Sequence, residues 1–189
     1  GITSDGQVVL HQGAMDIGQG ANTVISQIAA DALGVAVHDL KIVGGDTDLT
    51  PDCGKTSASR QTFVSGKAAM LSGMALRWKL LRHGNVDADA KISLDGATLR
   101  LEDAAGGAVR VELAGLPVNE YGYVFMAEET YDPPTSPLDE KGQGIPYAVF
   151  GYGAQIVELS VDMALGRVRL DKITTAHDVG RAINPLLVE

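Results

Sequence analysis

The strongest constraint on the fold of this chain is a Gly-Gln-Gly turn that stands directly between a strand pattern and a helix pattern. Residues 7–10 favour a short strand, and apolar side chains recur at helical spacing over residues 24–33. Gly18 and Gly20 free the backbone for a tight or left-handed turn, and neither has a Cβ that would hold a ligand away from the main chain. A single turn of this kind is more often a plain strand-to-helix connection, so the rest of the sequence has to decide.

The elements around this turn follow one another in a regular order. We expect Asn22 or Thr23 to cap the first helix and Gly34 to end it, because these residue types are preferred at those positions. A strand is expected over residues 40–43, and a polar loop with Pro, Asp and Gly then leads to a second helix.

The second helix is expected over residues 58–81, with a broad apolar face. Gly66 and Gly73 lie inside it, where glycine lowers helix stability, so we expect close packing against a neighbouring element there. The apolar face should consist of Phe63, Val64, Met70, Leu71, Met74, Trp78 and Leu81.

The remaining patterns are those of strands and loops. Residues 87–113 alternate in the manner of short hairpin strands, which indicates a small β-hairpin insertion over residues 85–115. Prolines over residues 133–146 indicate an extended segment, and residues 156–161 and 168–173 should form an antiparallel hairpin. The predicted fold is therefore α+β: a two-layer domain of mixed β-sheet packed against two main helices.

Composition narrows the classes of partner. The formal net charge of −9 argues against nucleic acid and anionic membranes, because both attract clustered Lys and Arg. The chain has a single cysteine, Cys53, which excludes an internal disulfide and a metal site with several cysteines. No apolar run is long enough to span a bilayer and no leader is visible, so a cytoplasmic location is predicted. We also expect the 189 residues to be a piece of a longer polypeptide.

Three stretches carry residues suited to chemistry. The Gly-Gln-Gly turn opens a helix, and helix N-termini offer N–H groups and partial positive charge to anions. Residues 56–62, Thr-Ser-Ala-Ser-Arg-Gln-Thr, are small and polar, although Ser and Thr are also ordinary capping residues. Residues 177–185 bring a histidine and an aspartate to a strand end, where the structural alternative is a polar loop.

In this order, the motifs resemble the large, molybdopterin-binding subunit of the xanthine dehydrogenase and aldehyde oxidase family of molybdenum hydroxylases, in its C-terminal cofactor-binding domain. The resemblance is weakest at about residues 84–115. The matching stretches are residues 13–23, 27–35, 45–51, 56–62, 146–148, 153–155, 161–168 and 177–185.

The resemblance implies a cofactor site formed by two segments of this chain. Gly18, Gln19 and Gly20 match the turn that contacts the molybdenum end and the pterin. A second segment would line the pterin, with Ala58 on the substrate side of the metal: Thr56, Ser57, Ala58, Ser59, Arg60 and Gln61. The dithiolene sulfurs of molybdopterin, in its mononucleotide or dinucleotide form, hold the metal, so no Cys or His ligand is needed from the chain.

Cys53 invites a more specific interpretation. One relative carries a special cysteine in an unusual active site, but on a loop from a different part of the subunit. We therefore favour the simpler interpretation, in which Cys53 is a partly buried small residue. The family's general base, a glutamate, lies beyond the last residue of this sequence. Glu189 does not match it, and no catalytic residue is assigned to this chain.

By resemblance, the intact enzyme hydroxylates an electron-poor carbon of a purine, an N-heterocycle or an aldehyde, with oxygen from water. Electrons leave through [2Fe–2S] clusters, often to FAD, on other domains or subunits, so the partners are the rest of its own subunit and these redox modules. The chain alone is expected neither to retain the cofactor nor to turn over substrate. Two alternatives are a nucleotide- or phosphate-binding module without redox activity and an excised domain whose parent has lost its activity.

Overall fold

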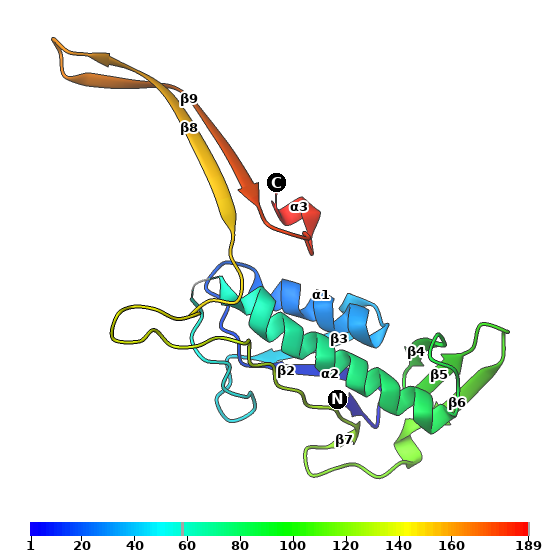
Figure 1. The fold of residues 1–189 in the computed structure, drawn as a ribbon. Coiled ribbons are helices and arrows are strands. Elements are labelled where there is room, and N and C mark those ends of the chain that lie inside the picture. The colour runs from blue at the N-terminus through cyan, green and yellow to red at the C-terminus, as the bar shows by residue number, and fades with distance from the viewer. Residues whose placement is uncertain (58, 189) are drawn as a thin grey trace. The chain divides into compact units, whose positions relative to one another are not determined.

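The computed structural model describes residues 1–57 and 59–188, and the chain divides into two compact units, Gly1–Pro133 and Pro134–Glu189. Each unit is described by itself. The first unit contains a mixed sheet, two long helices and a second, smaller sheet (Figure 1). Its elements are β1 (Ile2–Thr3), β2 (Val8–Gln12), α1 (Ala21–Leu33), η1 (Val37–Asp39), β3 (Leu40–Gly44), α2 (Arg60–Gly84), β4 (Lys91–Asp95), β5 (Thr98–Glu102), β6 (Ala108–Glu112), η2 (Leu113–Gly115) and β7 (Tyr123–Phe125).

The main sheet has the order β3-β2-β1-β7 and mixes both strand directions. β2 pairs with β3 in parallel, with Val8 opposite Leu40 and Gln12 opposite Gly44, whereas β1 is antiparallel to both of its neighbours. α1 connects the two parallel strands, as parallel pairing requires a crossover rather than a hairpin. The α+β fold predicted from the sequence is confirmed, with β2 and β3 beginning and ending within two residues of the predicted strands.

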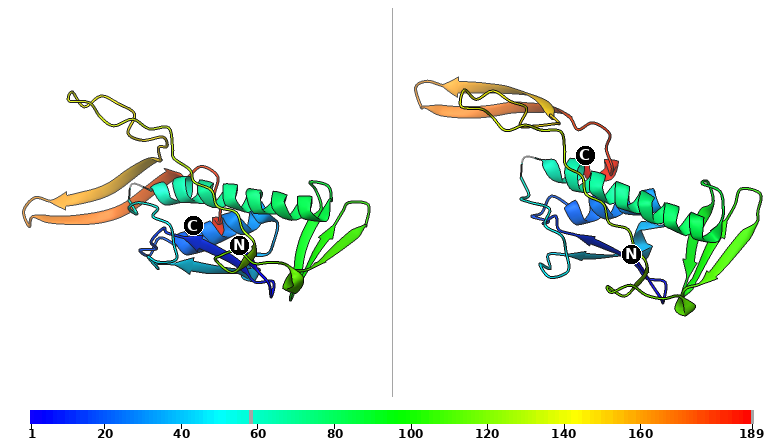
Figure 2. Two further views of the ribbon diagram at one scale, coloured as in Figure 1. Left: turned by 90° about the horizontal axis from the view of Figure 1, so that it is seen from below. Right: turned by 60° about the horizontal axis from the view of Figure 1, so that its bottom comes forward.

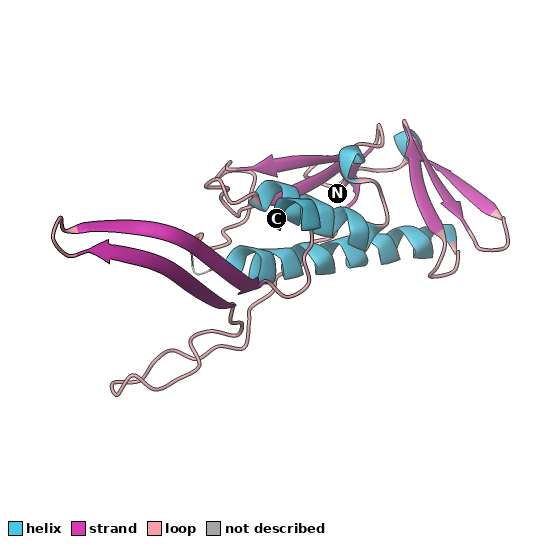
Figure 3. Ribbon diagram, turned by 90° about the horizontal axis from the view of Figure 1, so that it is seen from above, coloured by secondary structure: helices cyan, strands magenta, loops and turns pink. Residues whose placement is uncertain are grey.

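The two long helices run parallel and lie side by side, as all views show (Figure 2, Figure 3). A Cβ built on Gly66 would lie 2.9 Å from Cδ1 of Ile28, and one on Gly73 would lie 2.8 Å from the carbonyl oxygen of Ala29. The helices therefore approach as closely as their backbones permit. The prediction that the two glycines mark close packing is confirmed.

The apolar face predicted for α2 is wrong for Met74 and Trp78, which are 43% and 52% exposed. Of the rest, Val64 and Leu81 are buried, and Phe63, Met70 and Leu71 are partly buried. Small residues, Gly66, Ala69 and Gly73, stand where α2 faces α1 at short range. The buried residues of α2 are Gln61, Val64, Gly66, Ala69, Gly73, Leu76, Leu80 and Leu81.

Both ends of α2 lie further along the chain than the predicted residues 58 and 81. The helix begins at Arg60 and continues to Gly84, where Asn85 takes the left-handed conformation with φ of 50° and ends it. The three strands β4, β5 and β6, which fall in the segment predicted as an insertion, pack against this last part of α2. Leu99, Leu101 and Leu80 are 0% exposed in the shared core.

The second unit is built around one long antiparallel hairpin. β8 (Tyr152–Asp162) and β9 (Arg167–Asp178) pair from Tyr152 opposite Asp178 to Asp162 opposite Arg167, with an irregularity next to Glu158. The predicted hairpin is confirmed, and both of its strands are longer than predicted. A short helix, α3 (Pro185–Val188), follows. The proline-containing segment before β8 forms a loop, as predicted, which Ser136 closes by accepting the amide of Ile145 at 2.9 Å.

We expect Gly73→Ala to destabilise the chain even though alanine is the better helix former by about 1 kcal/mol. The added methyl group would meet the Ala29 carbonyl and force α1 and α2 apart, for a net loss of about 1–3 kcal/mol in the free energy of unfolding. Urea unfolding measures this. Gly115→Ala is the matched control, because a Cβ there meets nothing within 4 Å. Equal or greater stability of the Gly73 variant would contradict the close helix contact.

Candidate functional site

The topology brings two loops to one edge of the main sheet. The chain leaves β2 through residues 13–20 into α1, and leaves β3 through residues 45–59 into α2. Because β2 and β3 are parallel neighbours, both loops follow the carboxyl ends of their strands. In sheets of this kind, that edge is where ligands bind, next to the N-termini of the helices that follow. The predicted segment Gly18–Gly20 lies in the first of these loops. In the second predicted segment, Thr56, Ser57 and Ser59 lie in the other loop, and Arg60 and Gln61 begin α2.

Direct contacts join the two loops. Thr56 donates a hydrogen bond from Oγ1 to the carbonyl oxygen of Met15 at 2.9 Å. Closer to the sheet, a Cβ built on Gly13 would lie only 1.8 Å from the carbonyl oxygen of Pro51, so a side chain at that position would clash with backbone. The structure therefore brings together segments that lie about 40 residues apart in the sequence.

The Gly-Gln-Gly turn is open on its outer side. Gly18 and Gly20 have φ angles of 102° and 81°, in the region that favours glycine. A Cβ built on either one meets nothing within 4 Å. The positive φ angles therefore require glycine at both positions, although a side chain there would meet no neighbouring atom. The open space beside the two glycines leaves the main chain accessible to a ligand.

Asp16 organises the entry into α1. Its carboxylate accepts the backbone N–H groups of Gly18 at 2.9 Å, Gly20 at 3.3 Å and Asn22 at 3.1 Å. These bonds hold the pKa of the Asp16 carboxyl below its usual range, and the bond from the Asn22 N–H lowers it most. The predicted capping by Asn22 or Thr23 is wrong, because α1 already begins at Ala21. The capping position is Gly20, which has no side chain to cap the helix.

Gln19 turns its amide back onto its own loop. Its Oε1 accepts the N–H of Ile17 at 2.7 Å, and its Nε2 donates to the carbonyl of Met15 at 3.2 Å. The side chain is exposed, but both ends of the amide are bonded within the turn. A contact from Gln19 to a ligand therefore requires these bonds to be exchanged.

The second segment presents small residues on a strained backbone. Ser57 and Ser59 are exposed, and Ser59 precedes α2 in the left-handed conformation, with φ of 54° and no side-chain cap. Left-handed serine is uncommon, and such strain is concentrated at functional sites. Ala58, the predicted neighbour of the metal, lies outside the described residues.

Arg60 and Gln61 bond to their own loop. The Nη1 atom of Arg60 donates to the carbonyl oxygens of Cys53 at 2.8 Å and of Lys55 at 3.1 Å. Gln61 is only 6% exposed, and its Nε2 donates to Thr56 Oγ1 at 3.0 Å. These two side chains therefore shape the loop in this structure.

His11 anchors the second loop from the side of the sheet. Its Nδ1 lies 2.9 Å from the carbonyl oxygen of Leu49, which can only accept, so this nitrogen carries the proton. Its Nε2 then accepts from the hydroxyl of Tyr123 at 2.5 Å. Burial raises the pKa of that Tyr123 hydroxyl, which keeps it in the donating form.

Sequence reasoning assigned no role to Asp16 or His11. For Asp16 a signal was present, because an aspartate placed two residues before a glycine is suited to accept turn amides. His11 has no comparable signal, since its two partners, Leu49 and Tyr123, are distant in the sequence and meet only in the folded chain.

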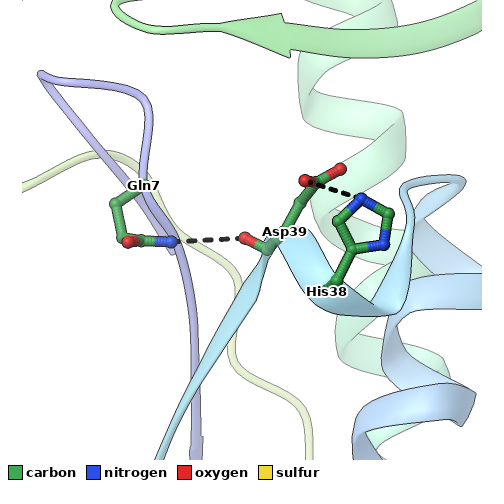
Figure 4. A network of polar contacts seen from close by, with 3 residues as sticks. All are labelled: Gln7, His38 and Asp39. Carbon is green, nitrogen blue, oxygen red and sulfur yellow. Dashed lines mark hydrogen bonds and ion pairs between the residues drawn. The ribbon is translucent and has the colours of Figure 1, made fainter.

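Other polar features lie away from these loops. An open hollow of about 360 Å³ is lined by Asp5, Gln7, His38 and Asp39, among others. Figure 4 shows its polar contacts: Gln7 donates to the Asp39 carbonyl at 3.2 Å, and the His38 ring lies 3.4 Å from the Asp39 carboxylate. The hollow is shallow and exposed, and neither predicted cofactor segment contributes to it.

The third predicted stretch, residues 177–185, begins in the last two residues of β9 in the second unit. His177 lies opposite Gly153 in the hairpin, and Asp178 accepts the amide of Gly180 at 2.8 Å. These contacts are those of a strand end and a turn. Within residues 1–57 and 59–188, no three His, Cys, Asp or Glu side chains gather so as to hold a metal ion. None of the helices described here combines the length and the apolar character needed to cross a membrane.

Known proteins are similar to this chain over its whole length. The family model described as molybdopterin cofactor-binding domain matches residues 1–189. A putative xanthine dehydrogenase molybdenum-binding subunit of Escherichia coli is 31% identical over 202 residues, which cover 100% of this chain and 24% of that protein. The gamma subunit of the 6-hydroxypseudooxynicotine dehydrogenase complex of Paenarthrobacter nicotinovorans is 28% identical, with coverage of 98% and 23%.

Among solved structures, the aldehyde oxidoreductase of Desulfovibrio desulfuricans matches 99% of this chain with a TM-score of 0.71 and 26% identity. The match covers 18% of that protein. This chain thus spans about a quarter or less of the length of these relatives.

We expect Asp16→Asn to destabilise the chain at neutral pH, because an amide oxygen accepts the three N–H groups more weakly than a carboxylate does. The pKa of Asp16 is lower in the folded than in the unfolded chain, so its contribution is present above the unfolded value of about 4 and is lost as the pH falls through the folded value. The free energies of unfolding of the two proteins, measured with urea, should therefore differ at pH 7 and converge as the pH falls below the unfolded value of about 4. The control is Asp132→Asn, at an exposed position outside helices and strands. A difference that is independent of pH would contradict this role.

Proposed function

The chain belongs to the molybdopterin cofactor-binding domain family, and from that premise we propose that it forms one wall of the cofactor site of a molybdenum hydroxylase. The observation that carries the proposal is the meeting of its two small-residue loops at one sheet edge, joined by the bond from Thr56 to Met15. A flat pterin with a phosphate needs close backbone approach and neutral donors and acceptors. Both loops offer these.

Two features of the described residues fit such a group. The Cβ positions of Gly18 and Gly20 are empty, so a ring system could lie against the backbone there. The Oε1 atom of Gln12 is buried and has no partner among the described residues, although its Nε2 donates to Asn22 in the first turn of α1 at 2.8 Å. A buried acceptor without a donor is costly. A donor group on a bound cofactor or a water could satisfy it.

We assign binding and orientation, rather than bond-making, to this chain. Gly18 and Gly20 would admit the cofactor to the backbone, and the hydroxyl groups of Ser57 and Ser59 would bond to its polar edges. When bound, the cofactor supplies the molybdenum redox chemistry, as cofactors do in general. The chain's own part is to hold it in one orientation and to keep bulk and competing charge away from it. Ala58 stays a proposed neighbour of the metal on the resemblance alone.

The alternative of a phosphate-binding module is disfavoured by Asp16. Three N–H groups at the entry to α1 already bond to its carboxylate, and that carboxylate would repel a phosphate placed there. The comparisons, too, lead to molybdenum enzymes. A helix N-terminus with a built-in anion suits a neutral part of a ligand better than a charged one.

The second unit supplies the proposed contact with the rest of the subunit. On one face of the hairpin, three apolar pairs follow one another: Val157 with Ile173, Leu159 with Leu170, and Val161 with Val168. On the other face the pairs are Glu158 with Lys172, Ser160 with Arg169, and Asp162 with Arg167. All six apolar side chains are between 45% and 63% exposed.

This apolar face is too large to be left in water. A two-stranded hairpin is marginally stable without a covering layer, and contiguous exposed apolar patches mark interaction surfaces. The relatives are about four times longer than this chain, so their subunits contain ample polypeptide for a covering layer. We propose that further polypeptide of the same subunit covers the face formed by Val157, Leu159, Val161, Val168, Leu170 and Ile173.

The reaction proposed for the intact enzyme is hydroxylation of an electron-poor carbon in a purine, an N-heterocycle or an aldehyde, with oxygen from water. The names of the relatives cover this range, from xanthine to 6-hydroxypseudooxynicotine and aldehyde. Electrons would pass to [2Fe–2S] clusters and FAD on other domains or subunits. One of the relatives is itself named as a subunit of a complex.

We expect Ser57→Phe, made in the full-length protein that contains this sequence, to lower its content of molybdenum and pterin at least about tenfold. Ser57 is exposed beside Ser59, so the added ring would occupy the space assigned to the cofactor without disturbing the core. Metal analysis and pterin fluorescence measure the content. Ser57→Ala, which removes only the hydroxyl group, should lose much less. Full cofactor content in the phenylalanine variant would remove Ser57 from the site.

Substitutions at Leu159 and Ser160, which are adjacent but lie on opposite faces of the hairpin, test whether further polypeptide covers the apolar face. We expect Leu159→Glu to make the full-length protein more sensitive to limited proteolysis, because it places a charge in an apolar contact. Ser160→Glu adds the same charge one residue further on, on the face that already carries charged residues, and should have little effect. If the two variants were cleaved at the same rate, the apolar face would be a solvent surface.

A further inference from the structure

We propose that Thr56, Gln61 and Ser65 act as positioning residues, through a chain of hydrogen bonds that sets the spacing between the two loops of the site. The role in shaping a cofactor site rests on the proposed function, whereas the hydrogen bonds themselves are described contacts. Thr56 Oγ1 donates to Met15 O at 2.9 Å, Gln61 Nε2 donates to Thr56 Oγ1 at 3.0 Å, and Ser65 Oγ donates to Gln61 Oε1 at 2.5 Å.

The direction of each bond follows from the acceptor at its end. The carbonyl oxygen of Met15 can only accept, so the single hydroxyl hydrogen of Thr56 is committed to it. Thr56 can then only accept from Gln61, which must present its NH₂ group to Thr56 and its oxygen to the hydroxyl of Ser65. The chain of bonds has one consistent polarity, from a turn inside α2 to the glycine turn before α1.

Burial makes this arrangement costly to break. Gln61 is 6% exposed, in the first turns of α2, and its Nε2 lies 3.9 Å from the sulfur of Cys53 on the same loop. If Thr56 loses its hydroxyl group, a buried amide donor is left without its partner, which costs more than the bond itself contributes. Met15, which precedes the glycine turn, would lose its hydrogen bond to the second loop.

Gln61 therefore has a different role from the cofactor contact that the family resemblance implies. Both ends of its amide are occupied inside the protein, and the side chain is shielded from solvent. Arg60 supports the same loop from the other side by donating to the carbonyls of Cys53 and Lys55. Of the second segment, Ser57 and Ser59 are the described residues left exposed toward a ligand.

Amide hydrogen exchange in the full-length protein, prepared without molybdopterin, tests the geometry apart from the cofactor. The reporters are the N–H groups of Gly18, Gly20 and Asn22, which bond to Asp16 in the turn next to Met15. In Thr56→Val, which keeps the shape and removes the hydroxyl group, their exchange should speed up about tenfold. Thr56→Ser restores the hydroxyl group and should restore slow exchange. Thr62→Val, at an exposed threonine in α2, is the matched control and should change nothing.

A double variant and the cofactor content distinguish a positioning role from a general loss of stability. Thr56→Val and Gln61→Leu should be non-additive in exchange rate, because either one breaks the same chain of bonds. In the full-length protein, Thr56→Val should also lower molybdenum and pterin content severalfold, and Thr56→Ser should recover it. Global unfolding of each variant, followed by urea, shows that the variant is folded.

Each outcome decides one point. Unchanged exchange at Gly18, Gly20 and Asn22 in Thr56→Val would overturn the hydrogen-bond chain, and additive effects of the two variants would do the same. Faster exchange with full cofactor content would overturn the positioning role. A full-length wild-type protein that carries no molybdopterin would instead end the proposed function, while the exchange data would still report on the bond chain by themselves.

Discussion

The parallel pairing of β2 with β3 is the constraint on which the site depends. It requires a crossover, which α1 supplies, and it directs the loops after both strands to one edge of the sheet. α1 and α2 then start at that same edge and run side by side. With an antiparallel pair the two loops would leave from opposite ends of the strands, and no contact between Thr56 and Met15 could form.

Small residues set how closely the rest can approach. Gly66 and Gly73 bring α2 against the backbone of α1, and Gly13 brings the glycine turn against the loop at Pro51. Two larger apolar side chains of α2, Met74 and Trp78, are exposed. The same choice of small residues continues into the two loops, where Gly18 and Gly20 leave open space instead of filling it. Close packing in the body of the domain and open backbone at its edge thus have a common origin in residue size.

Charge is distributed in keeping with a site for a ligand whose own groups supply the chemistry. The chain carries a net charge of −9, yet the two predicted cofactor segments, Gly18–Gly20 and 56–61, contain a single charged residue, Arg60. Elsewhere the two loops carry Asp16, Asp46, Asp48, Asp52 and Lys55. Asp16 is satisfied by three backbone amides, and Arg60 by two carbonyl oxygens. Both ions therefore stabilise the shape of the loops. The surfaces they leave exposed, at the glycine turn and at Ser57 and Ser59, are uncharged.

The sequence alone determined the α+β class, the family resemblance, the two helices, the ending of α1 at Gly34 and the β8–β9 hairpin, because these depend on local periodicity and on residues adjacent in the chain. Only the tertiary structure decided which face of α2 is buried, that Asp16 rather than Asn22 or Thr23 organises the entry to α1, and that Gln61 turns inward to Thr56. Hydrophobic periodicity identifies large apolar residues, but it cannot show that α1 approaches so closely that no side chain fits at Gly66 and Gly73. Hydrogen-bond partners such as Thr56 and Met15 become neighbours only when parallel strands bring distant loops together.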